Sequence, residues 1–134
     1  ASDENAAQFV VNVVSDLAAG YCGPVLVKET GIPTEPVEKG FTEKRQASFY
    51  AELQHRFAAA STAPAASAAP GERAFAYFSA FDAPWRVNDA GPAPGQHPAP
   101  EEAHWGLFDE KRRPKPVVAS IPPLTSRSSP PHHE

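Results

Sequence analysis

Apolar residues recur at helical spacing near the N-terminus of the chain. Two neighbouring i, i+4 rows form a broad apolar stripe, and these rows are Phe9, Val13, Leu17 and Val10, Val14, Ala18. Such a stripe predicts an amphipathic helix whose apolar side packs on a core. Ser2 or Asp3 can cap this helix, which we expect to run to about Ala19 before Gly20 stops it.

A second helix is predicted to begin after Thr42, whose hydroxyl can cap it. Its apolar residues again recur at helical spacing, and they are Ala47, Tyr50, Leu53 and Phe57. The helix is expected to dissolve at Ala58, because residues 58–70 form a stretch of Ala, Ser, Thr and Pro that is typical of a loop.

Two other segments have the character of strands. Residues 24–30 contain a Val-Leu-Val run bounded by glycines, and residues 73–82 are filled with small and aromatic side chains. Runs of this kind predict parallel strands, and the second run is expected to be covered on both faces of the sheet. Strand, helix and strand together predict a βαβ unit with a right-handed crossover, and therefore an α/β fold.

The rest of the chain is more irregular. Residues 83–100 are rich in Pro and Gly, residues 101–108 have an ordered character, and a short last helix is expected from Pro116. Pro122 and Pro123 prevent that helix from extending far. We expect residues 1–120 to form one domain and residues 121–134 to be a disordered, Pro- and Ser-rich tail.

Composition narrows the class of protein. The 134 residues carry a formal net charge of -4, which argues against a nucleic-acid partner. The basic run from Lys111 to Lys115 is expected to be a solvated turn. No apolar stretch approaches the ~20 residues of a membrane span, and no signal-peptide pattern is present. Cys22 is the single cysteine, so an intramolecular disulfide is excluded, and we expect a buried thiol.

Each predicted strand ends in a carboxylate, Glu29 in the first and Asp82 in the second. The carboxyl ends of parallel strands share one edge of a sheet, which is where α/β proteins place their chemistry. Glu29 is therefore a candidate nucleophile or general base. A simpler interpretation is that Lys28 and Glu29 are the solvated end of a strand, and that Asp82 caps the following turn.

Aromatic residues accompany these carboxylates. Trp85 follows Asp82, and Trp105 lies in a third cluster with Glu102 and His104. Indole rings pack on the C–H faces of sugars while carboxylates bind hydroxyls and cleave glycosidic bonds, so the combination suits carbohydrate. Both tryptophans could instead simply cover the end of the sheet. We expect neither a metal nor a cofactor, since no second His or Cys stands at ligand spacing from His104.

Three blocks in order, residues 25–33, 76–86 and 102–108, resemble the C-terminal part of glycoside hydrolase family 17, a family of β-1,3-glucanases and glucanosyltransferases. The resemblance covers roughly Asn5 to Val118. It implies that the chain is the C-terminal portion of a (β/α)8 TIM barrel, about its last two βα units. It also implies that Glu29 is the nucleophile at the end of the seventh strand.

By the same resemblance, Asp82, Trp85 and Arg86 would lie near the sugar at the end of the eighth strand. Glu102 would join that rim and pair with Arg86, with Trp105 beside it. The implied ligand is a β-glucan oligosaccharide or polysaccharide, no cofactor is involved, and an extracytoplasmic location would fit.

The sequence also departs from the family. Ile32 stands where many members have tryptophan, and Ala83 occupies a position that is acidic in many. A full barrel needs ~250 residues, and no block resembles the fourth strand, which carries the family's general acid. We therefore expect a poorly active chain whose partner is the N-terminal half of the barrel. The alternatives are a non-catalytic glucan-binding or structural remnant, a transglycosylase when complete, and a fragment that folds poorly.

Overall fold

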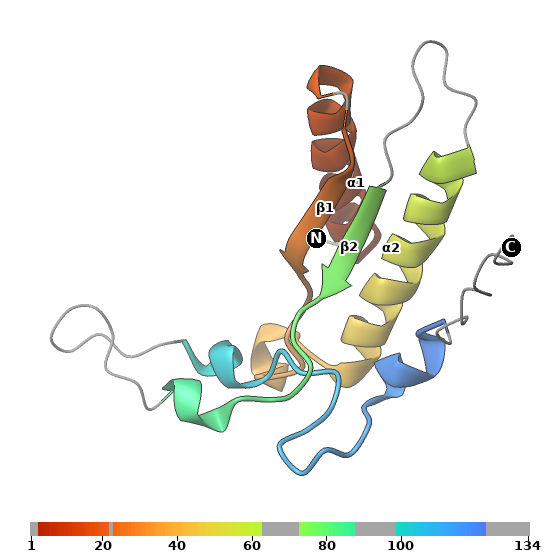
Figure 1. The fold of residues 1–134 in the computed structure, drawn as a ribbon. Helices are drawn as coiled ribbons and strands as arrows, with labels where there is room; N and C mark the ends of the chain where they lie inside the picture. Colours follow the sequence, from red (N-terminus) through yellow and green to blue (C-terminus); the bar gives the residue numbers. More distant parts are fainter. Residues whose placement is uncertain (1–2, 22, 63–72, 88–98, 123–134) are drawn as a thin grey trace, which may run out of the picture.

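The computed structural model describes residues 3–21, 23–62, 73–87 and 99–122. Its main elements are α1 (Asp3–Gly20), β1 (Val25–Thr30), α2 (Glu43–Thr62) and β2 (Arg73–Tyr77), as Figure 1 shows. Short 3₁₀ helices follow, including η2 (Pro84–Val87), η3 (Pro100–Ala103) and η4 (Pro116–Ser120). The predictions for Cys22, for residues 63–70 and for the tail beyond Pro122 lie outside the described residues.

Both predicted helices are confirmed. The backbone N–H of Arg45 donates to Oγ1 of Thr42 at 3.1 Å, so Thr42 caps α2 as expected. The prediction that this helix dissolves at Ala58 is wrong, because α2 continues to Thr62. Alanine is the strongest helix former, and the alanines that follow Phe57 extend the helix until it ends at Ser and Thr.

The two strands pair in parallel, with Val25 beside Arg73 and Val27 beside Phe75. The second strand is shorter than predicted, since β2 ends at Tyr77. Beyond it, the chain pairs with residues 105–108: Ser79 N–H donates to the Trp105 carbonyl at 3.0 Å, and Leu107 N–H donates to the Ser79 carbonyl at 2.9 Å. Asp82 therefore does not close a strand, because its neighbours bond to a segment that is distant in sequence.

The core lies between the two helices and one face of the sheet. Its fully buried side chains include Ala7 of α1 and Tyr50 and Leu53 of α2, and Val27 and Phe75 pack against them from the strands. Leu26, on the other face of β1, is exposed. The expectation that the second strand is covered on both faces is not met within the described residues, since β2 is only partly buried.

The apolar stripe of α1 is only partly buried. Val14 is buried, but the row Phe9, Val13 and Leu17 is exposed. The prediction that the whole stripe packs on a core is therefore wrong for this row, because α2 contacts the neighbouring side of the helix.

The C-terminal helix η4 packs against α2. As predicted, the helix at Pro116 is short: η4 ends at Ser120, and it packs on α2 with Val117 fully buried. None of the described helices is both long and apolar enough to span a membrane. The described residues form a parallel sheet of two strands, so membership of a larger barrel stays a prediction.

Candidate functional site

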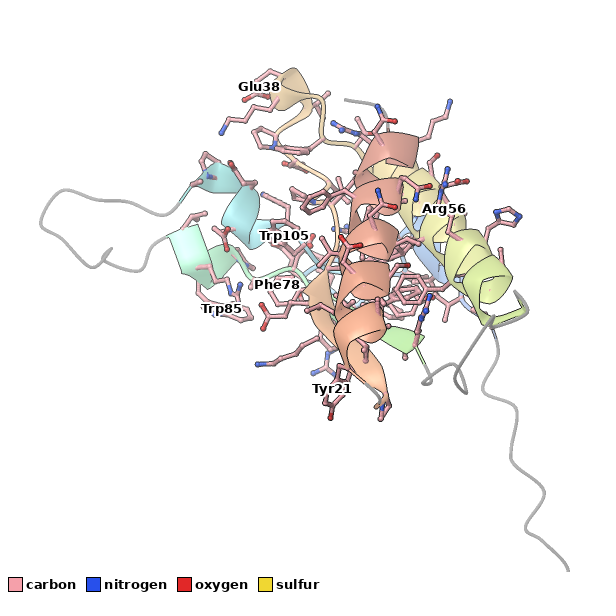
Figure 2. All side chains as sticks on the ribbon, turned by 90° about the horizontal axis from the view of Figure 1, so that it is seen from above. Tyr21, Glu38, Arg56, Phe78, Trp85 and Trp105 are labelled. Atoms are coloured by element: carbon pink, nitrogen blue, oxygen red, sulfur yellow. The ribbon has the colours of Figure 1, made fainter. Side chains whose placement is uncertain are left out.

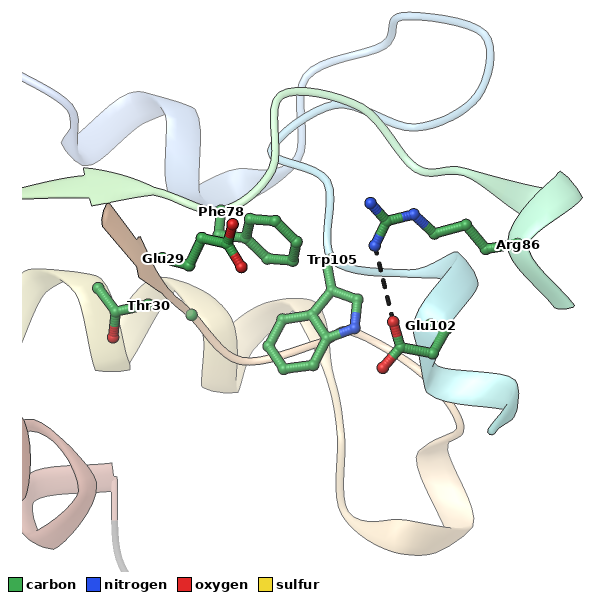
Figure 3. A pocket seen from close by; sticks show the side chains of 7 residues that line it. Glu29, Thr30, Phe78, Arg86, Glu102 and Trp105 are labelled. Atoms are coloured by element: carbon green, nitrogen blue, oxygen red, sulfur yellow. Dashed lines mark ion pairs between the residues drawn. The ribbon is translucent and has the colours of Figure 1, made fainter. Parts of the chain in front are cut away.

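An open pocket of about 560 Å³ lies at the carboxyl ends of β1 and β2. Figure 3 shows the side chains around it. Its lining comes from the end of β1, from the segment after β2, from η2 and from the η3 region, and it consists of Glu29, Thr30, Gly31, Phe78, Arg86, Glu102 and Trp105. Four of the six residues predicted for the site, Glu29, Arg86, Glu102 and Trp105, thus share one pocket.

Glu29 lies where the pairing of the two strands becomes irregular. Val27 pairs with Phe75, but the next pair joins Thr30 to Tyr77, so β1 carries an extra residue between them. Such a bulge turns the affected side chains out of the regular alternation. The Glu29 side chain is about half exposed, and its Oε1 lies 3.7 Å from Nζ of the exposed Lys28. The carboxylate is therefore accessible from the pocket.

Tyr50 holds the two strand ends together beneath the pocket. Its hydroxyl donates to the Thr30 carbonyl at 2.7 Å and accepts the Phe78 N–H at 3.1 Å. Burial raises the pKa of Tyr50 to about 12, so the phenol stays neutral and can donate. A Cβ on Gly31 would lie 2.6 Å from this hydroxyl, which explains why glycine follows Thr30.

Phe78 and Trp105 form an aromatic wall. Their ring centroids are 5.7 Å apart in an edge-on arrangement, and Figure 2 shows them side by side. The Trp105 backbone is fixed by Ser79 N–H and by Nε2 of the buried Gln46, which also donates to the carbonyls of Ile32 and Gly106 at 3.2 Å. The indole Nε1 is buried and makes no hydrogen bond among the described residues.

Arg86 and Glu102 form an ion pair on the far side of Trp105 from Glu29 (Figure 3). Nη1 of Arg86 lies 3.6 Å from Oε2 of Glu102, so the pairing expected from the sequence is present. The guanidinium also lies over the Phe78 ring, 5.6 Å from its centroid. Both partners are partly exposed, which leaves donor and acceptor atoms available to a ligand.

Two predicted site residues are not in this pocket. Trp85 is largely exposed on η2 and is absent from the lining. Asp82 is buried beneath the rim, where Oδ1 accepts from Nζ of Lys115 at 2.7 Å and from the Gly106 N–H at 2.9 Å. Its carboxylate is buried and is held by the protein itself.

Sequence reasoning missed Tyr50, Gln46, Phe78 and Lys115. The expectation that Lys115 belongs to a solvated turn is wrong, since its side chain is buried and Nζ also bonds Oγ1 of Thr34 at 2.8 Å. The sequence does contain an indication that Lys115 is buried, because this residue stands between two prolines and next to an apolar run.

No three His, Cys, Asp or Glu side chains in the described part of the chain are grouped so as to hold a metal ion. His104 contacts carboxylates instead, with Nε2 3.6 Å from Glu35 and Nδ1 3.9 Å from Asp82. Comparisons with protein-family models, with curated proteins and with solved structures find no match for this chain. A functional assignment therefore rests on the chemistry of the site and on the sequence blocks around it.

Proposed function

We propose that Glu29 is the nucleophilic carboxylate of a retaining β-1,3-glucan hydrolase, in a barrel that a further N-terminal half completes. One observation carries this proposal: Glu29 shares an open pocket with an aromatic wall and with the Arg86–Glu102 ion pair. The three sequence blocks that resemble glycoside hydrolase family 17 supply these groups.

The lining suits a sugar in both its apolar and its polar parts. Phe78 and Trp105 offer apolar ring surface to the C–H groups of a pyranose. Arg86 is a donor, while Glu29 and Glu102 accept from hydroxyl groups. A neutral, hydroxyl-rich oligosaccharide uses all of these groups together.

In the proposed reaction, a carboxylate oxygen of Glu29 attacks the anomeric carbon while the bond to the leaving oxygen breaks. A general acid, about 5–5.5 Å from the nucleophile in retaining enzymes, protonates that oxygen. Water, deprotonated by the same group, then attacks the anomeric carbon and frees Glu29. If a sugar hydroxyl takes the place of water, the product is a longer glucan.

The general acid is assigned to the N-terminal half. Glu102 is the other carboxylate among the described residues of the pocket, and it is engaged by Arg86. General acid assistance contributes typically ~10²–10⁴-fold, so the isolated chain should be nearly inactive on natural glucan.

An activated glycoside tests the role of the nucleophile separately from that of the general acid. A dinitrophenyl 2-fluoro-β-laminaribioside has a leaving group that needs no acid, so it should label Glu29 covalently in the isolated chain, as seen by mass spectrometry of peptides. Glu29→Gln should not be labelled, and Glu43→Gln on the helix surface should be labelled as in the wild type. Absence of labelling at Glu29, or clear turnover of natural glucan by the isolated chain, would contradict this mechanism.

A non-catalytic glucan-binding module is the second candidate. It is favoured by the exposed ion pair of Glu29 with its neighbour Lys28, which is common at a strand end. Titration with laminari-oligosaccharides distinguishes the two functions. Binding that survives Glu29→Ala but is lost in Trp105→Ala, together with no covalent labelling, favours the binding module. Trp85→Ala is the matched control, since Trp85 lies outside the pocket lining.

A further inference from the structure

Gln46 is a polar residue on the buried side of α2, and its exposed fraction is 0%. Phe49, Tyr50 and Leu53 of the same helix are buried in the core with it. Burying an amide costs free energy unless hydrogen bonds compensate, and a leucine or methionine would fill the same space without that cost. The amide at this position therefore needs an explanation beyond packing.

The Gln46 amide binds main-chain carbonyls of two segments that are far apart in the sequence. Nε2 donates to the carbonyl of Ile32 at 3.2 Å, and it also lies 3.2 Å from the Gly106 carbonyl and 3.4 Å from that of Trp105. Ile32 stands 14 residues before Gln46, and Gly106 stands 60 residues after it. One NH₂ group thus joins the loop after β1 to the segment that carries Trp105.

These two segments supply different parts of the pocket lining. Glu29 and Gly31 come from the end of β1 and the start of the loop that follows it, and Trp105 comes from the other segment (Figure 3). Because Nε2 of Gln46 bonds main-chain atoms, it fixes the backbone from which the Trp105 side chain projects. Gln46 therefore determines where the indole lies relative to the Glu29 carboxylate.

Tyr50 makes a similar connection one helical turn later. Residues four apart lie on the same side of an α-helix. The Tyr50 hydroxyl joins the Thr30 carbonyl to the Phe78 N–H, while Gln46 joins the loop after β1 to the Trp105 segment. α2 thus places two polar groups beneath the pocket, and each bonds the β1 side to a different segment of the lining.

The Gln46 amide also carries an unpaired atom. Its Oε1 is buried and makes no hydrogen bond among the described residues. A buried acceptor without a partner lowers stability, and such a group in a folded protein calls for an explanation. The donor nitrogen of the amide, and not its oxygen, accounts for a glutamine at this position.

We propose that Gln46 is a positioning residue that fixes Trp105 relative to Glu29. The identity of the ligand rests on the proposed function: a sugar packed on the indole presents its anomeric carbon to Glu29 only while the Trp105 segment keeps its place. Without the Gln46 donor, this segment loses a buried link to the loop after β1. A misplacement of about 1 Å can cost about 10²-fold in rate. The loss should therefore appear in the chemical step more than in binding.

The test compares Gln46→Met with Gln54→Met, which also removes an amide from α2. Nε2 of Gln54 donates to the Tyr77 hydroxyl at 2.6 Å, and neither of these two residues lines the pocket. With the dinitrophenyl 2-fluoro-β-laminaribioside, Gln46→Met should lower the maximal rate of Glu29 labelling at least about tenfold and change the half-saturating concentration less than about threefold. Gln54→Met should match the wild type in both quantities. A wild-type maximal rate in folded Gln46→Met would overturn the proposal.

A second measurement needs no ligand. The chain has two tryptophans, so in a Trp85→Phe background the fluorescence reports on Trp105 alone. Gln46→Met should increase acrylamide quenching and shift the emission to longer wavelength, because the indole, whose Nε1 is buried, becomes more exposed. Gln54→Met should change neither property. Equal quenching in the two variants would overturn the proposal, whatever the labelling experiment shows.

The two measurements can fail separately. If the wild type is not labelled but Gln46→Met still exposes Trp105, the proposed mechanism fails and the positioning of Trp105 by Gln46 stands. Gln46→Asn covers the case in which Gln46→Met does not fold. Asparagine keeps the amide but is one methylene shorter, so its nitrogen should not reach both segments, and Trp105 quenching should again increase. If circular dichroism shows that neither variant folds, Gln46 supports the whole fold and not the site, and the proposal is overturned.

Discussion

Nζ of Lys115 lies 2.7 Å from Oδ1 of Asp82, and both side chains are buried. The pair joins the segment after β2 to the C-terminal segment, and Lys115 donates a second bond to Thr34 in the loop after β1. Three stretches that are distant in sequence are thus tied together beneath the pocket. The ion pair supports the rim of the site from below.

Lys115→Met should destabilise the chain by about 3–5 kcal/mol, because it leaves the Asp82 carboxylate buried without its cation. Urea unfolding measures this loss. The exposed Lys111→Met is the control and should change the free energy of unfolding by less than about 0.5 kcal/mol. If Lys115→Met unfolds like the control, the buried pair does not hold these segments together.

Tyr50→Phe should make stability less sensitive to alkaline pH. The pKa of Tyr50 is raised from 10.0 to about 12 by burial, so its stabilising effect is complete below pH 10 and is lost as pH rises towards 12. The wild type should therefore lose on the order of 2 kcal/mol more than Tyr50→Phe over that range. Urea unfolding at pH 8 and at pH 11.5 measures the gap between the two proteins.

At pH 8 the order is simple: Tyr50→Phe should be less stable than the wild type, since the Thr30 carbonyl and the Phe78 N–H lose their partner. Tyr21→Phe, which alters an exposed tyrosine, should match the wild type at both pH values. A constant gap between wild type and Tyr50→Phe at the two pH values would refute the role given to burial.

Gly106→Ala should abolish the folded arrangement of the pocket. A Cβ at this position would collide with the backbone of Phe81, Asp82 and Phe108, none of which can move without breaking the pairing between residues 79–82 and 105–108. Loss of the Trp105 fluorescence signature and a large fall in Tm are expected. Gly20→Ala, where a Cβ meets nothing within 4 Å, should leave Tm unchanged or raise it.

Arg86→Met should weaken ligand binding and change the free energy of unfolding only slightly. The Arg86–Glu102 pair is partly exposed, so its loss should cost at most about 1 kcal/mol in unfolding. On the proposed function, laminari-oligosaccharide affinity should fall at least about tenfold, because a donor to sugar hydroxyls is removed. Arg113→Met breaks the exposed pair with Asp109 outside the pocket and should leave affinity unchanged. If Arg86→Met binds the oligosaccharide as tightly as the wild type does, Arg86 does not contact the ligand.

Local pattern accounts well for the helices and less well for the second strand. The spacing of Tyr50, Leu53 and Phe57 predicted α2 because helical periodicity is a property of neighbouring residues. The aromatic run after Tyr77 looks like a continuing strand, yet its partners are residues 105–108, which no local pattern specifies.

The residues of the site likewise include some that the sequence identifies and one whose role depends on a distant contact. Glu29, Arg86, Glu102 and Trp105 were identified from sequence blocks, and they line one pocket. Asp82 was also identified, but the same carboxylate chemistry serves a ligand or a buried lysine equally well. Only the position of Lys115, 33 residues away, decides between the two.

By itself, the sequence determined the order of helix and strand, the carboxylate at the end of β1 and the apolar character of α1, since these depend on residue type and short-range spacing. The tertiary structure alone decided which apolar residues are buried and which carboxylate lies in a buried ion pair. Burial and pairing depend on what the rest of the chain brings alongside. Glu29 is left open to the pocket, Asp82 is neutralised, and Phe9 and Leu17 remain exposed.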